Sequence, residues 1–346
     1  MPSDFALNII QVRRAEGIVY DPRNGKEGIA EAFFNYQGKF CFNEFLPTSV
    51  PKEVPHNSKK AMKIFRKLMN TLLGKPEYVE IMIDFFAWWV QHPGEKIRWA
   101  PLIQSAQGGG KSMLGDIVQA LFGHQNTKIV EPGSITSDFN DWAVGCMALV
   151  VEEMFVPGKD RMRVLNSMKT LVTNDTISAR IKRESMRVML NTTNVLFFTN
   201  FHAALFLEES DRRYMVIESP LQSKQDVERV NASGLWKQVA KLKDELAPAL
   251  RYALLNHEVS EDFPVNGPAP ITEFRKDNVF QSKAPALLAI EDAIDDEDVL
   301  TVGSDLIMTK RLSEILGPSI TGKNASVQLM QLGYRIFNGG ARYSFG

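Results

Sequence analysis

The stretch SAQGGGKS, residues 105–112, constrains the fold of this chain more than any other segment. It ends in Gly110, Lys111 and Ser112, like the phosphate-binding pattern G-x-x-x-x-G-K-[ST], but Ser105 stands where the first glycine belongs. WAPLIQSA before it predicts a strand, and KSMLGDIVQALFG after it predicts a helix that ends at Gly123. A glycine turn that merely precedes Lys-Ser is the alternative. The strand–loop–helix order favours a phosphate loop instead.

A phosphate loop assigns a role to each of its residues. Glycines let backbone N–H groups converge on phosphate oxygens, and the N-terminus of the following helix adds positive potential. We expect Lys111 to contact the β- and γ-phosphates of ATP and the Ser112 hydroxyl to bind Mg²⁺. Ser105 costs only conformational freedom at the loop entrance. The predicted nucleotide-binding residues are Gln107, Gly108, Gly109, Gly110, Lys111 and Ser112.

Polar residues follow two further predicted strands. The apolar run MALVV ends in Glu152 and Glu153, about 40 residues after the glycine loop. We assign Glu152 to the Mg²⁺ shell and Glu153 to the attacking water, as general base. NVLFFTN ends in Asn200, whose amide is suited to the γ-phosphate or to orienting the water. The simpler alternative is that the two glutamates are a solvated strand end and that Asn200 is a turn-forming asparagine.

Two adjacent arginines open the last predicted strand of this region. Arg212 and Arg213 follow Asp211 and precede YMVIES. Pairing with local carboxylates is the simpler interpretation. The functional alternative is an arginine finger that stabilises transition-state charge on the ATP of a neighbouring subunit.

A local excess of cations lies between the acidic pair and Asn200. The segment ISARIKRESMRVML predicts a hairpin that turns near Arg183, and a solvated hairpin is the simple explanation of its charge. In a chain with a net charge of −1, such an excess also suggests a surface that follows a nucleic-acid backbone. The candidate DNA-binding residues are Lys169, Arg180, Lys182 and Arg183.

The chain divides into five expected units. Strands alternating with helices predict a three-layer α/β ATPase core over 96–220. A loop and β linker segment (1–57) and a helical bundle assigned to oligomerisation (58–95) precede it. A helical region with a polar linker (221–275) and a winged-helix-like unit (276–346) follow it. Within the bundle, the aromatic cluster at 85–89 is a base-stacking platform or, more simply, core.

Composition excludes several classes of protein. The apolar run at 81–90 is too short for a membrane span and contains Asp84. Cys41 and Cys146 are too few for a disulfide framework or a zinc ribbon. MPSDFALNII lacks the layout of a secretion signal. We therefore expect a cytoplasmic protein without a structural metal, located in the host cell if a phage encodes it.

With these segments in order, the chain resembles the superfamily 3 helicases, in particular phage and plasmid primase-helicases with a C-terminal AAA+-type P-loop ATPase. The matching stretches are QGGGKS (107–112), ALVVEE (148–153), LVTNDTISARIK (171–182), FFTN (197–200) and DRRY (211–214). Many relatives have an aspartate where this chain has Glu-Glu, so the sequence departs from the family pattern there as well as at Ser105.

The resemblance implies a homo-oligomeric ring, usually a hexamer, that uses ATP and Mg²⁺ and unwinds forked duplex by moving along single-stranded DNA in the 3′ to 5′ direction. It favours Arg213 over Arg212 as the finger and matches Lys182 to the family's hairpin lysine. No primase motif is visible, so priming would belong to another chain or to a missing N-terminal part. A non-translocating AAA+ loader or switch and a small-molecule P-loop kinase are the alternatives.

Overall fold

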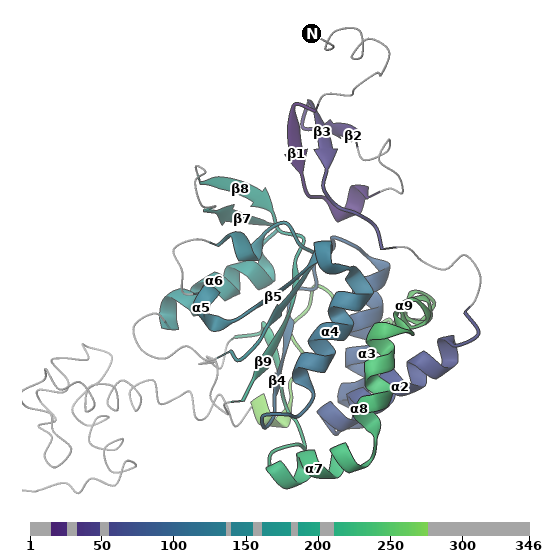
Figure 1. Ribbon diagram of the computed structural model, residues 1–346. Coiled ribbons are helices and arrows are strands. Elements are labelled where there is room, and N and C mark those ends of the chain that lie inside the picture. The colour runs from purple at the N-terminus through teal and green to yellow at the C-terminus, as the bar shows by residue number, and fades with distance from the viewer. Residues whose placement is uncertain are drawn as a thin grey trace, which may run out of the picture.

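The structure is a computed structural model that describes residues 15–25, 33–48, 55–135, 140–154, 161–180, 186–200 and 211–275. Figure 1 shows a central sheet with helices on both sides. The predicted winged-helix-like unit lies outside the described residues.

The central sheet has five parallel strands in the order β10-β4-β9-β6-β5. Its strands are β4 (Ala100–Gln104), β5 (Thr127–Val130), β6 (Ala148–Val151), β9 (Asn194–Thr199) and β10 (Tyr214–Glu218). The three central strands β4, β6 and β9 are buried along their whole length. Near-continuous apolar runs are expected where helices cover both faces of a parallel sheet.

Alternate residues of these strands face two different cores. Ile103, Val150 and Phe198 pack in a core with the helices α2 (Ser58–Leu73), α3 (Pro76–Gln91), α4 (Lys111–Phe122), α8 (Leu235–Asp244) and α9 (Ala247–Leu255). Leu102 and Phe197 pack in a second core with α6 (Arg161–Thr173). The chain is therefore a three-layer α/β structure, as the alternation of strands and helices predicts.

Helices α2 and α3 match the two helices expected in the 58–95 segment. Gly74 ends α2 with φ +74°, and Pro76 opens α3. The α3 aromatics Phe85, Phe86 and Trp89 are fully buried, and Trp88, the fourth member of the cluster, is partly buried against the same core. The Trp89 indole N–H donates to the carbonyl of Met147, 3.0 Å away, at the start of β6. These side chains are core, so they are not a base-stacking platform.

The basic segment forms the expected hairpin. Strand β7 (Thr176–Ala179) pairs antiparallel with β8 (Arg187–Leu190), from Thr176 opposite Leu190 to Ala179 opposite Arg187. The predicted turn at 181–185 lies outside the described residues. A second small sheet near the N-terminus has the order β1-β3-β2, with β1 (Gly17–Val19), β2 (Phe33–Tyr36) and β3 (Lys39–Asn43). The short helix α5 (Pro132–Ile135) follows β5.

The helical part of the expected 221–275 region consists of three separate helices. Helix α7 (Lys224–Ala232) begins with a capping box made by Ser223 and Asp226. Gly234, at φ +70°, separates α7 from α8, and Pro248 lies in the first turn of α9, where its missing N–H costs nothing. None of the described helices is long and apolar enough to span a bilayer.

The polar linker expected within the 221–275 region corresponds to residues 259–272, and this segment packs against the core. The Trp99 indole N–H donates to the carbonyl of Pro264 at 2.9 Å. Ala269 is buried, and its N–H donates to the carbonyl of Arg212 at 2.7 Å. Scattered apolar residues and prolines give no periodic pattern, so sequence reasoning missed this contact.

Candidate functional site

The glycine loop connects the end of β4 to the first turn of α4. Gly108 and Gly110 have φ values of +80° and +91°, a region that disfavours side chains. A Cβ at Gly110 would lie 2.3 Å from the Trp236 ring, so only glycine fits there. The loop thus exposes the N-terminus of α4, where the first N–H groups of a helix have no intrahelical acceptor. This end of the helix is suited to an anion.

Lys111 is buried at the base of the loop. Its ammonium donates to the Ser105 hydroxyl at 2.8 Å and to the Asn200 side-chain oxygen at 2.7 Å, and also to the carbonyls of Ser105 and Ala106. Burial lowers the pKa of Lys111 to about 8, although Glu153 and Glu152 oppose this shift. Because these acceptors are uncharged and the pKa of Lys111 is lowered, a bound anion would stabilise the charged ammonium of Lys111.

Ser105, which replaces the first glycine of the usual pattern, has a structural role of its own. Its side chain is fully buried, and its hydroxyl accepts a hydrogen bond from Lys111. A Cβ on Gly109 would lie 2.5 Å from that oxygen, so the neighbouring glycine accommodates the serine. Ser105 therefore helps to orient Lys111 across the loop.

The two glutamates leave β6 in different directions. The Glu152 N–H donates to the carbonyl of Val130 at 2.9 Å, which continues the β5–β6 pairing. One carboxylate oxygen of Glu152 lies 3.8 Å from where a Cβ on Gly115 of α4 would be. Glu153 is exposed and has φ +51°, which is uncommon for a residue other than glycine. Strained backbone of this kind concentrates at functional sites. Glu152 thus faces α4, whereas Glu153 turns toward solvent.

Asn200 reaches the loop because of the strand order. Strand β9 lies between β4 and β6, so its carboxyl end is adjacent to both the glycine loop and the glutamates. The Asn200 side-chain oxygen contacts Lys111, and the Gln104 amide donates to the Asn200 carbonyl at 3.4 Å.

One cavity of about 430 Å³ brings these residues together. It contains all six predicted loop residues, both glutamates and Asn200, and its lining is Gln107, Gly108, Gly109, Gly110, Lys111, Ser112, Met113, Glu152, Glu153, Phe198, Asn200, Asn231 and Trp236. Sequence reasoning missed Asn231 and Trp236, which come from α7 and α8. No local motif marks them, because they reach the loop only through the packing of α8 on α4.

Arg212 and Arg213 lie at the opposite edge of the sheet. In the parallel register of β10 and β4, Tyr214 pairs with Ala100 and Glu218 with Gln104. The arginines precede the first pair and the glycine loop follows the last, so about 16 Å of strand separates them. They do not line the glycine-loop cavity.

The two arginines differ in their surroundings. Arg213 donates from a guanidinium N–H to the buried Asp211 carboxylate at 3.3 Å, which is the local pairing expected in the simpler interpretation. Its buried Nε has no hydrogen-bond partner among the residues that the structure describes. Arg212 is exposed, and its carbonyl accepts from Ala269.

The candidate DNA-binding residues are also separate from the cavity. Lys169 lies on α6, and Arg180 follows β7, where its N–H donates to the Asn140 side chain at 2.6 Å. Lys182 and Arg183 lie outside the described residues. Among the residues that the structure describes, no three His, Cys, Asp or Glu side chains group as a metal site. The predicted Mg²⁺ would thus rely on Ser112, Glu152 and phosphate oxygens.

The chain is similar in sequence to a family of proteins and to a phage replication protein. Residues 103–213, which include the glycine loop, the glutamates and the arginines, match a family described as a family of unknown function (DUF5906). Over 184 residues the chain is 26% identical to the DNA primase-polymerase of Nitratiruptor phage NrS-1, covering 53% of this chain and 25% of that protein. The match thus spans about a quarter of the relative's length.

Two solved structures of the NrS-1 C-terminal region, both apo, extend the similarity. One is 21% identical with a TM-score of 0.62, covering 85% of this chain and 68% of that one. The other is 20% identical with a TM-score of 0.61, covering 95% and 80%. The chain shares the fold of that region.

Proposed function

We propose that this chain is a phage DNA replication protein whose glycine-loop cavity binds and hydrolyses ATP. The observation that carries the proposal is the shared cavity of Lys111, Glu153 and Asn200 beside the N-terminus of α4. An ammonium that can hold phosphate oxygens, and a carboxylate and an amide that can position the attacking water, are groups that phosphoryl transfer to water uses. The similarity to a phage DNA primase-polymerase supplies the replication context.

Each residue has a role in the proposed reaction. The loop N–H groups and Lys111 hold the phosphates, and Lys111 exchanges its neutral acceptors for phosphate oxygens. Ser112 and Glu152 offer hard oxygen ligands, which suit Mg²⁺. Bound there, Mg²⁺ would neutralise charge on the β- and γ-phosphate oxygens. Glu153 accepts a proton from the attacking water, and Asn200 orients that water.

We further propose that the chain acts as a helicase ring, hexameric as in the proteins it resembles, that moves along single-stranded DNA at a fork. The position of Arg213, about 16 Å of strand from its own loop, favours action on a neighbouring subunit's ATP. DNA contacts are assigned to Lys169, Arg180, Lys182 and Arg183. A primase or polymerase, on another chain or domain, is the proposed partner.

A strand-displacement assay tests this function. With ATP and forked DNA, a helicase separates the strands, and its mass in solution rises on ring formation. A non-translocating loader would hydrolyse ATP without separating the strands. A small-molecule kinase would consume ATP at a rate that DNA does not increase.

Glu153→Gln is expected to bind ATP normally but to hydrolyse it at least ~100-fold more slowly, because it removes the general base. Nucleotide binding and single-turnover hydrolysis measure the two steps separately. Glu152→Gln is the matched control, and it should weaken Mg²⁺-dependent ATP binding instead. Loss of ATP binding in Glu153→Gln would show that the two roles are exchanged.

The affinity for ATP is expected to fall as the pH rises through the Lys111 pKa of about 8. Below that pH the ammonium is charged and attracts phosphate, and above it the neutral amine does not. The decline is at most about tenfold per pH unit, measured from about pH 7.5, above the phosphate pKa of about 6. Lys111→Arg should remove the dependence, because its guanidinium stays charged. An equal slope in both proteins would contradict the assignment.

A further inference from the structure

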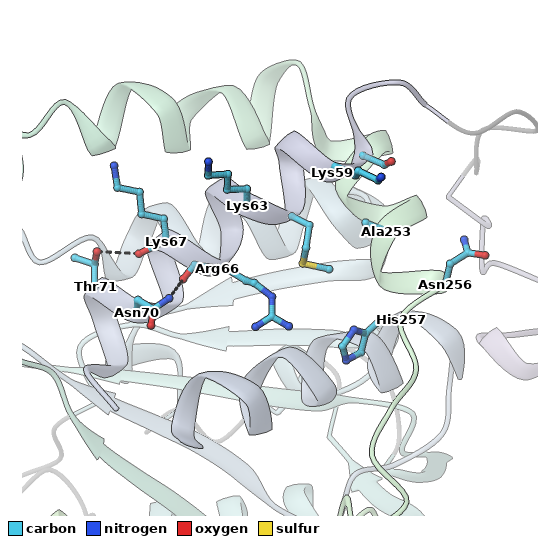
Figure 2. A pocket seen from close by; sticks show the side chains of 11 residues that line it. Lys59, Lys63, Arg66, Lys67, Asn70, Thr71, Ala253, Asn256 and His257 are labelled. Carbon is cyan, nitrogen blue, oxygen red and sulfur yellow. Dashed lines mark hydrogen bonds between the residues drawn. The ribbon is translucent and has the colours of Figure 1, made fainter. Parts of the chain in front are cut away.

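A second groove, larger than the glycine-loop cavity, lies along the surface of helix α2. It has a volume of about 840 Å³ and runs along α2 to the end of α9 (Figure 2). Its lining residues are Ser58, Lys59, Met62, Lys63, Arg66, Lys67, Asn70, Thr71, Ala253, Asn256 and His257. None of them lines the glycine-loop cavity.

The groove is strongly basic. Four of its lining residues are lysine or arginine and none is acidic, and α2 itself contains no Asp or Glu. Arg66 pairs with Glu80 of α3, at 3.0 Å between Nη2 and Oε2. Lys59, Lys63 and Lys67 are exposed, and no carboxylate of the described residues pairs with them.

Helix stability does not account for these lysines. Lys59, Lys63 and Lys67 stand four residues apart, and like charges at this spacing repel each other. Lys59 also lies in the first turn of α2, where the helix dipole disfavours a positive charge. A negatively charged partner removes both penalties.

The arrangement fits an extended anion better than a small one. Lys63 and Lys67 extend to the same side of α2, whereas Arg66 extends to another (Figure 2). The lysines follow the helix axis over about 12 Å and do not converge on one point. Hydroxyl and amide side chains, such as those of Ser58 and Asn256, accompany them, and these groups commonly contact a sugar–phosphate backbone.

We infer that this groove binds the phosphodiester backbone of a nucleic-acid strand without reading its sequence. It would be a second contact for nucleic acid, outside both the glycine-loop cavity and the β7–β8 hairpin. The inference shares its ligand class with the proposed function but depends on neither ATP hydrolysis nor the hairpin lysine.

The test removes the three unpaired lysines together. Lys59→Gln/Lys63→Gln/Lys67→Gln is compared with Lys39→Gln/Lys60→Gln/Lys241→Gln, which removes three exposed charges outside the groove. Binding of a labelled single-stranded oligonucleotide is followed by fluorescence anisotropy between about 50 and about 200 mM salt. The groove variant should bind more weakly, and the slope of log affinity against log salt should fall by about 2. The control should keep the wild-type slope.

Thermal unfolding is used to check that each variant is folded. If the triple groove variant does not fold, the single variant Lys63→Gln replaces it, and its salt slope should be lower than that of the wild type by about 0.7. An unchanged slope in both groove variants would overturn the inference. A changed oligomeric mass with unchanged DNA binding would also overturn it, in favour of an acidic face on a neighbouring copy. Lys111→Ala protein should keep the wild-type salt slope for DNA binding. Failure of the proposed ATP site can therefore be distinguished from failure of the proposed groove contact.

Discussion

Lys111→Ala is expected to abolish measurable ATP hydrolysis while the protein remains folded. Its ammonium is the charged group nearest the loop, and loss of one transition-state donor commonly costs about 10²–10³ in rate. Loss of phosphate binding adds to this effect. Turnover and nucleotide binding are measured beside the thermal unfolding temperature, which should fall little because Lys111 lines the cavity, where water can replace it as the donor to the carbonyls of Ser105 and Ala106.

Lys96 offers a matched control for this experiment. It is also a buried lysine, and burial lowers its pKa to about 7, but its ammonium donates to the carbonyl of Leu171 at 2.8 Å and to that of Thr193. Lys96→Ala leaves these carbonyls unpaired and should cost about 1–3 kcal/mol of stability. The folded fraction should still hydrolyse ATP. Near-normal turnover in folded Lys111→Ala would refute the site.

Arg213→Ala is expected to lower ATP hydrolysis by about 10³–10⁵, the effect of removing an arginine finger, and to leave ATP binding intact. The strand register places Arg213 away from its own loop, so its partner ATP would belong to another subunit. Arg212→Ala, at the exposed neighbouring position, is the control and should have a much smaller effect.

Mixing distinguishes a finger acting between subunits from a structural arginine. Arg213→Ala protein and Lys111→Ala protein are each expected to be inactive, but a mixed ring would contain interfaces with an intact loop and an intact arginine. Some turnover should therefore return on mixing. If none returns, and Arg213→Ala instead lowers the unfolding temperature, then Arg213 serves mainly to pair with Asp211.

Local patterns predicted the main elements of the α/β core. The apolar runs that become β4, β6 and β9 and the glycine loop before α4 follow from hydrophobic pattern and turn chemistry. The same patterns predicted the aromatic positions of α3 as core and the β7–β8 hairpin. Where apolar residues lacked a period, as in 259–272, the sequence misled, because contacts to distant segments hold that part of the chain.

The sequence by itself thus determined which residues offer phosphate-binding and acid–base chemistry: Lys111, the two glutamates and Asn200. Only the tertiary structure decided how they meet. The strand order inserts β9 between β4 and β6, which brings Asn200 to Lys111, and the packing of α8 on α4 brings Trp236 over Gly110. The parallel register carries Arg213 to the opposite edge. These placements depend on pairings between residues far apart in sequence, and such long-range pairings leave no trace in local periodicity or composition.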